Sequence, residues 1–149
     1  MSLEQWARNG WLRKHKTSAR EVADLLAIVD RDLKEAERAI SNDWKFGIAY
    51  NAALKLCTIL LNASGYRPDR LQAHFRTLQS LPLILGSQRK SDADYLDACR
   101  KTRNTAEYES VGIVTDAEAK ELIDFTKRLR KDVIVWLREN HSNLLREIK

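Results

Sequence analysis

The chain has 149 residues, of which 44% are hydrophobic and 32% are charged, and its formal net charge is +5. This size and composition argue against a disordered or multidomain protein, and we expect a single domain over residues 1–149. The 5 glycines and 2 prolines provide few turn-forming residues, so long helices are expected rather than many short strands. The positive charge modestly favours an anionic partner such as nucleic acid.

Residues 3–15 are predicted to form a short amphipathic segment that ends in a basic run. The first long helix is expected to begin after Ser18, because Ser18 and Glu21 have the spacing of a capping box. Apolar residues then recur at the period of an α-helix, which predicts a surface helix ending near Ser41. These apolar residues are Val22, Leu25, Leu26, Val29, Leu33, Ala36 and Ile40.

A second helix is predicted from Trp44 to about Ser64, with Asp43 as its cap. Apolar residues cover nearly every side of this segment, so we expect neighbouring helices to enclose it at the centre of the fold. Its uncharged run is too short to cross a bilayer, because Lys45 and Lys55 interrupt it. No membrane partner is therefore expected.

Residues 67–69 are predicted to form a turn, and the next helix is expected to begin near Asp69 and to break or kink at Pro82. Residues 86–90 are predicted to be a polar loop. Ser91 is then expected to cap another helix. The predicted inner face of that helix consists of Tyr95, Cys99, Thr102 and Ala106.

The last helix is predicted to be long and to reach about Asn140. It opens with a second capping box, formed by Thr115 and Glu118. Together these elements predict an all-α protein, a single up-and-down bundle of four to five long helices.

Few residues outside the helical pattern suggest chemistry, and no metal or cofactor is expected. Cys57 and Cys99 lie far apart on apolar faces, as expected of buried thiols in a cytoplasmic protein. We expect His15 and His141 to be exposed and inert. His74, on an amphipathic helix, is expected at the surface or its boundary.

The segment from Arg100 to Tyr108 is the candidate binding site. Arg100, Lys101 and Arg103 supply positive charge, and a guanidinium can bind a phosphate through two parallel hydrogen bonds. Asn104 can orient that guanidinium or bind a ribose. Tyr108 can stack on a base or donate through its hydroxyl.

A purely structural role is the alternative for this segment. Arg103 can pair with Glu107 four residues on, while Tyr108 closes the end of the helix. On a continuous helix Arg103 and Tyr108 point about 140° apart. They can therefore share a cleft only if the helix ends near Glu107 or if two subunits form the cleft together.

Arg103, Asn104 and the layout of long helices resemble the HEPN superfamily, whose motif is an arginine, often followed by a polar residue, and then a histidine. Tyr108 stands where that family has its histidine. The resemblance implies a homodimer in a toxin–antitoxin, stress or phage-defence module, with a possible nucleotidyltransferase or antitoxin partner. It also implies contact with RNA, but a phenol with a pKa of about 10 is a poor base for cleaving it.

Three functions follow as hypotheses. The first is binding of RNA or a nucleotide-like anion at a cleft lined by Arg103 and Asn104, with contacts from Arg100, Lys101 and Tyr108. The second is a metal-independent endoribonuclease that uses Arg103, Asn104 and Tyr108 as catalytic residues. The third is a helical scaffold for protein–protein interaction, without nucleic-acid binding.

Overall fold

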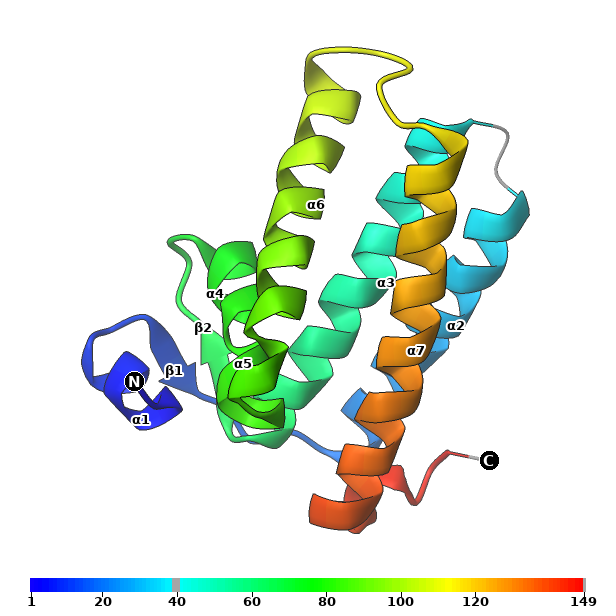
Figure 1. The fold of residues 1–149 in the computed structure, drawn as a ribbon. Coiled ribbons are helices and arrows are strands. Elements are labelled where there is room, and N and C mark those ends of the chain that lie inside the picture. Colours follow the sequence, from blue (N-terminus) through cyan, green and yellow to red (C-terminus); the bar gives the residue numbers. More distant parts are fainter. Residues whose placement is uncertain (39–40, 149) are drawn as a thin grey trace.

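The computed structural model describes residues 1–38 and 41–148, which form a bundle of helices with a small antiparallel sheet beside it (Figure 1). The predicted all-α bundle is confirmed. Its long helices are α2 (Ala19–Arg38), α3 (Asn42–Ala63), α6 (Lys90–Tyr108) and α7 (Asp116–Asn140). The shorter elements are α1 (Leu3–Arg8), β1 (Leu12–Lys14), β2 (Tyr66–Pro68), α4 (Ala73–Gln79), α5 (Leu81–Leu85) and the 3₁₀ turns η1 (Ser87–Arg89) and η2 (Ser142–Leu145).

Helix α3 is the centre of the fold and packs against α2, α4, α6 and α7 (Figure 1). Apolar residues occur on almost every side of α3, so each neighbouring helix has an apolar surface to cover. The predicted enclosure is confirmed, and Tyr50, Leu56, Ile59 and Leu60 are fully buried. Contrary to the expectation drawn from Lys45 and Lys55, α3 is long and apolar enough to cross a membrane by length and composition alone. A core helix can have the same properties, and 72% of the apolar window of α3 is buried inside the bundle.

The start of α3 differs from the prediction. Ser41, and not Asp43, caps the helix, because the backbone at Ser41 is extended and its Oγ accepts a hydrogen bond from the Trp44 amide at 3.1 Å. The carboxylate of Asp43 instead accepts from the backbone amides of Gly112 at 2.7 Å and Val114 at 3.4 Å. Asp43 therefore holds the loop between α6 and α7 against the start of α3.

The start of α2 confirms half of the predicted capping box. The Glu21 amide donates to Ser18 Oγ at 3.1 Å, but the Glu21 side chain turns away from Ser18 to other partners. The predicted apolar stripe is buried at Val22, Leu26, Val29, Leu33 and Ala36, whereas Leu25 is half-buried. Ile40, the last residue of that prediction, lies outside the described residues.

The strand β1 in the N-terminal segment was not predicted from the sequence. Only residues 3–8 are helical, and β1 then pairs antiparallel with β2, with Leu12 opposite Pro68. The predicted turn over residues 67–69 is therefore wrong, because most of it belongs to β2. Trp6 and Leu12 pack with Leu61 of α3 as a second small core, which holds this sheet to the bundle.

The region between β2 and α6 also differs in detail. Helix α4 begins at Ala73 instead of near Asp69, and the chain breaks between α4 and α5 at Ser80, close to the predicted break at Pro82. The predicted loop over 86–90 contains η1, and α6 starts at Lys90 without a cap from the Ser91 side chain.

The buried face of α6 was predicted only in part. Cys99 is buried as expected, together with Ala93 and Leu96, whereas the predicted Tyr95, Thr102 and Ala106 are half-buried. The second predicted capping box is confirmed. Thr115 Oγ1 accepts from the Glu118 amide at 3.1 Å, and Glu118 Oε1 accepts from the Thr115 amide at 3.0 Å.

Candidate functional site

The predicted site residues lie on the last three turns of α6, which continues through Tyr108. Because the helix does not end at Glu107, Arg103 and Tyr108 point about 140° apart within one chain. Their surroundings differ accordingly: the Arg103 side chain is 19% exposed, whereas Tyr108 is 76% exposed. The structure does not bring these two residues together in one chain.

Arg103 packs against α3. Its Nε lies 3.2 Å from Glu107 Oε1 as an ion pair, and its Nη1 lies 3.4 Å from Asn104 Oδ1. Its guanidinium carbon is 5.7 Å from the centre of the Tyr50 ring, and Gly47 lies beside its stem. This is the ion pair of the structural alternative, and it ties the Arg103 guanidinium to Glu107.

Tyr50 lies beneath this part of α6 and is fully buried. Within the described part of the chain, its hydroxyl has no hydrogen-bond partner. Burial raises the pKa of this hydroxyl far above its ordinary value, and the charges of Arg100 and Arg103 offset that only in part. The phenol therefore stays protonated at neutral pH, as a donor without an acceptor.

Tyr50→Phe is expected to leave the free energy of unfolding unchanged or to raise it by up to about 1 kcal/mol, because it removes a buried, unsatisfied hydroxyl. Urea denaturation of both proteins, followed by circular dichroism, measures this difference. A loss of more than about 1 kcal/mol would contradict the expectation and would indicate that the hydroxyl binds a partner such as an ordered water.

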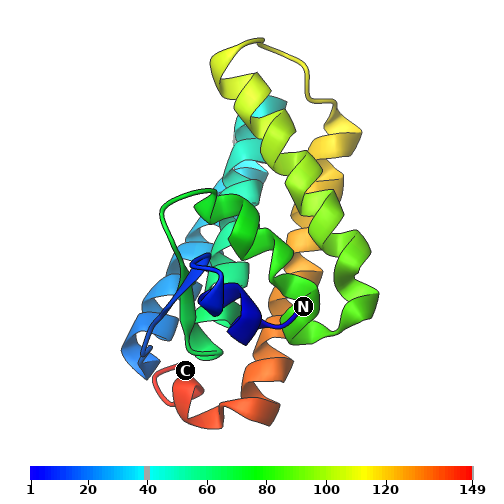
Figure 2. The ribbon, with the colours of Figure 1, turned by 90° about the vertical axis from the view of Figure 1, so that its left-hand side faces the viewer.

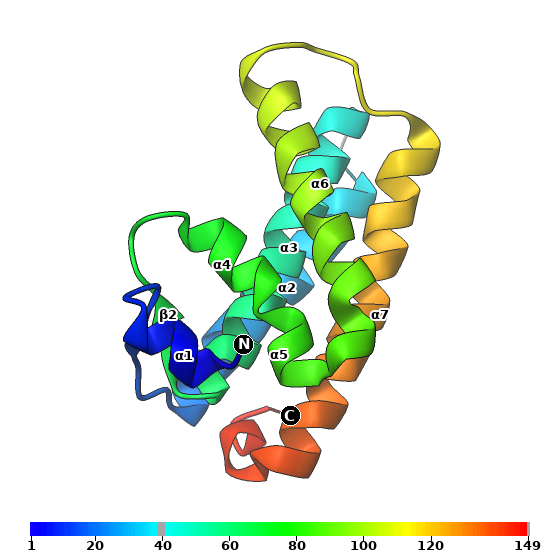
Figure 3. The same cartoon turned by 60° about the vertical axis from the view of Figure 1, so that its left-hand side comes forward.

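Arg100 and Lys101 line a groove of about 580 Å³ between α4 and α6, two helices that lie side by side in Figure 3. Arg100 pairs with Asp97 at 2.9 Å and is 25% exposed. Lys101 is 69% exposed and lies 3.6 Å from the same carboxylate. We call this hollow the α4–α6 groove, and its ionisable lining residues are Arg70, His74, Asp97, Arg100 and Lys101.

His74 reaches this groove from α4. Partial burial lowers its pKa, and the positive charges of Lys55, Arg100 and Arg103 lower it further. At neutral pH the imidazole is therefore mainly neutral and can donate or accept one hydrogen bond. Sequence reasoning placed His74 at the surface but missed its position opposite Arg100, because no local pattern indicates which helix α4 packs against.

Tyr108 lies in a different hollow. It lines a groove of about 620 Å³ formed by the start of α3, the end of α6 and the loop between α6 and α7. These three segments lie at the top of Figure 2. Trp44, Val111 and Val114 provide apolar walls, and we call this hollow the end groove. The predicted site residues are thus divided between two grooves, with Arg103 and Asn104 lining neither.

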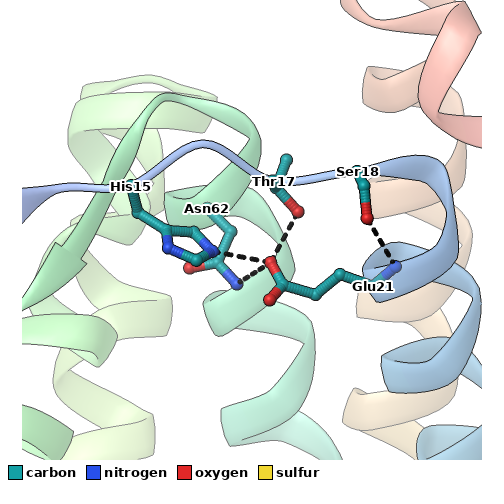
Figure 4. Close-up of polar contacts among 5 residues, drawn as sticks. All are labelled: His15, Thr17, Ser18, Glu21 and Asn62. Atoms are coloured by element: carbon teal, nitrogen blue, oxygen red, sulfur yellow. Dashed lines mark hydrogen bonds and ion pairs between the residues drawn. The ribbon is translucent and has the colours of Figure 1, made fainter.

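A polar cluster at the start of α2 corrects the prediction for His15 (Figure 4). Glu21 Oε1 lies 2.7 Å from His15 Nε2 and accepts hydrogen bonds from Thr17 Oγ1 at 2.6 Å and Asn62 Nδ2 at 3.2 Å. His15 is therefore half-buried and not freely exposed. His141, also predicted to be exposed, is half-buried with its ring 5.1 Å from that of Trp136.

The electrostatics of Glu21 favour its charged form. Burial acts to raise its pKa, but the hydrogen bonds from Thr17 and His15, together with the charge of His15, hold that pKa below its ordinary value. The cluster joins the segment after β1 to α2 and, through Asn62, to α3. We therefore assign it a structural role.

Both cysteines are buried, as predicted, and form no disulfide within the described residues. Burial raises the pKa of Cys57 and of Cys99 to about 12, so neither thiol is a nucleophile at neutral pH. Among residues 1–38 and 41–148, no group of three or more His, Cys, Asp or Glu side chains is placed to hold a metal ion.

Comparison of the chain with protein-family models, with curated proteins and with solved structures found no match. The resemblance to HEPN domains therefore stays a prediction that rests on Arg103, Asn104 and the helical layout.

Proposed function

We propose that this protein binds RNA or a nucleotide-like anion, and that the α4–α6 groove is the contact surface. The observation that carries this proposal is the convergence of positive groups from two separate segments. Arg70 approaches from the α4 side, beside the neutral imidazole of His74, and Arg100 and Lys101 approach from α6. Asp97 is the only acidic residue in the described lining of the groove, and it is paired with Arg100 and Lys101.

The groove offers the groups that single-stranded nucleic acid needs. Lys101 and Arg70 are exposed, so both can neutralise phosphates, and Asp97 keeps its contact with Arg100 when Lys101 turns to a ligand. Phe75 also lines the groove and is half-buried, which makes it available for stacking against an unpaired base. The ligand class that fits these groups is a single strand or a nucleotide.

The remaining predicted contacts take secondary roles in this proposal. Arg103 lies one helical turn beyond Arg100, but its ion pair with Glu107 offsets most of its charge. Lys101 and Tyr108 are seven residues apart and share a side of α6, with a rise of about 10 Å between them. Tyr108 nevertheless lies outside the α4–α6 groove, so the proposed RNA contact does not include it.

The resemblance to HEPN domains supports the same proposal and adds a homodimer, a toxin–antitoxin, stress or phage-defence setting, and a nucleotidyltransferase or antitoxin partner. The endoribonuclease hypothesis also requires a second subunit to complete the site, because Arg103 and Tyr108 point in different directions within one chain.

The test compares the double variant Arg70→Ala/Lys101→Ala with the wild type in binding to a fluorescein-labelled single-stranded RNA. Two phosphate contacts are removed, so the slope of log affinity against log salt concentration is expected to fall by about 1.4. Fluorescence anisotropy at several salt concentrations measures this slope.

Electrophoresis of the same RNA after incubation with the protein in EDTA tests the endoribonuclease hypothesis in parallel.

The control variant is Arg20→Ala/Lys34→Ala, which removes the same two charges from the exposed face of α2. It is expected to keep the wild-type slope to within about half a unit. If both double variants change the slope equally, the protein binds RNA through its overall charge and the groove assignment is wrong.

A further inference from the structure

The end groove concentrates exposed apolar side chains. Among the described residues, seven large hydrophobic side chains are exposed, and four of them are in or beside this groove. They are Trp44 at 65%, Tyr108 at 76%, Val111 at 94% and Ile113 at 40% exposure. Single exposed apolar residues are ordinary, but a cluster of this kind around a hollow of about 620 Å³ marks an interaction site.

The groove is preformed. The Asp43 carboxylate accepts hydrogen bonds from the amides of Gly112 and Val114, which holds the α6–α7 loop in place (the arch at the top of Figures 1 and 2). Gly112 has a φ of +77°, a conformation that suits glycine in this tight loop. Asn42 at the start of α3 also bonds Asp116 at the start of α7, at 2.6 Å. A partner would therefore meet an ordered surface, which lowers the entropic cost of binding.

The charge of this end is opposite to that of the whole chain. Residues 41–45 and 106–118 contain five acidic residues and one basic residue, whereas the complete chain has a net charge of +5. The ionisable carboxylates that line the groove are Asp43 and Glu107, and the ion pair with Arg103 offsets part of the charge of Glu107. An RNA phosphate backbone would be repelled here, and a cationic partner would be attracted.

The same charge argues against a second copy of this chain as the occupant. In a symmetric contact the same patch meets itself, so two acidic ends would face each other. The other exposed large hydrophobics among the described residues, Met1, Leu71 and Val135, are not part of the end groove. A symmetric contact with a second copy therefore brings no opposite charge to this surface.

We propose that the end groove binds a short segment of another protein in which an apolar or aromatic anchor is flanked by lysine or arginine. The anchor would pack between Trp44, Tyr108 and Val111. The flanking cations would lie near Asp43 and Glu107, and also over the exposed faces of the two aromatic rings. This site is separate from the α4–α6 groove, so it does not depend on RNA binding.

The test is a titration of the full ¹⁵N-labelled chain with the capped peptide KKLFLKK, followed by the backbone and indole NMR signals of Trp44 and the amide of Val111. The expected result is saturable shifts of these signals. The charge-inverted peptide EELFLEE and the anchor-free peptide KKGSGKK are expected to bind at least tenfold more weakly.

The variant Trp44→Ser/Val111→Ser removes two exposed anchors and is expected to weaken KKLFLKK binding at least tenfold, monitored by the Gly112 amide signal. Glu109→Lys is expected to weaken it roughly threefold by reducing the local negative charge. The matched control Leu71→Ser removes an apolar side chain that is 81% exposed outside the groove, and it is expected to bind as the wild type does.

Several results would overturn the proposal. These are the absence of saturable shifts with KKLFLKK, equal binding of EELFLEE, or binding that Trp44→Ser/Val111→Ser leaves unchanged. Concentration-dependent self-association that this double variant abolishes would assign the groove to a second copy instead. Displacement of KKLFLKK by single-stranded RNA acting at the same residues would assign it to nucleic acid. Failure of RNA to bind the α4–α6 groove would leave this proposal unaffected.

Discussion

Leu60→Ala is expected to lower the free energy of unfolding by about 3–5 kcal/mol, the largest loss that we predict for a single substitution in this protein. Leu60 is fully buried on α3, the helix that α2, α4, α6 and α7 all cover. Removing three carbon atoms there loses their transfer free energy and leaves a cavity, because the surrounding helices cannot all collapse onto the site. Urea denaturation monitored by circular dichroism measures the change.

Leu71→Ala is the matched control, since it makes the same chemical change at a side chain that is 81% exposed. Its expected effect lies within about 0.5 kcal/mol of zero. A loss below about 1.5 kcal/mol for Leu60→Ala would contradict the central position of α3. It would imply that the bundle can repack around this helix.

Glu21→Ala is expected to lower the free energy of unfolding by about 1–2 kcal/mol at neutral pH. The substitution removes the acceptor shared by His15, Thr17 and Asn62, and the Asn62 side chain is buried with no other hydrogen bond to a described residue (Figure 4). Because Glu21 is 38% exposed, water can replace part of the lost interaction, which limits the loss. Chemical denaturation at pH 7 measures the loss.

The same cluster predicts that the free energy of unfolding depends on pH. Because folding lowers the pKa of Glu21, its carboxylate stabilises the protein above the unfolded value, near 4.5, and that contribution is lost as pH falls through the lower folded pKa. The difference between wild type and Glu21→Ala should therefore shrink below about pH 4.5. Glu21→Gln keeps one acceptor oxygen, and it should show a smaller loss at pH 7.

A control for this series is Glu35→Ala, which removes an exposed carboxylate from the same helix. Its expected effect at pH 7 is within about 0.5 kcal/mol of zero. If Glu35→Ala and Glu21→Ala cost the same, the general charge of α2 is responsible, and the cluster at Glu21 makes no specific contribution.

The helices were predictable because their signals are local. The stripe from Val22 to Ala36 and the capping box of Thr115 and Glu118 involve residues three or four positions apart, and each is found as expected. The cap of α3 was predicted two residues too late, at Asp43 instead of Ser41. Serine and aspartate are both good caps, so the sequence alone does not choose between them. In the structure the backbone at Ser41 is extended, and Asp43 accepts hydrogen bonds from the α6–α7 loop instead.

The candidate site was less predictable than the fold. Arg100 and Lys101 were identified from their own helix, but His74 and Arg70 come from a different segment and join them only through the packing of α4 on α6. The sequence predicted that Arg103 and Tyr108 would point in different directions if the helix continued past Glu107. In the structure α6 continues to Tyr108, so these two residues lie on different sides of the helix.

The sequence by itself determined that this protein is a helical bundle, that α3 is its core helix, and that the end of α6 is rich in charged and polar groups. These properties depend on periodicity and on contacts within one helical turn. Tertiary structure alone decided that Arg103 lies against Tyr50, that Lys101 shares a groove with His74, and that acidic and apolar groups meet at Tyr108. These contacts depend on how whole helices pack, which no short stretch of sequence specifies.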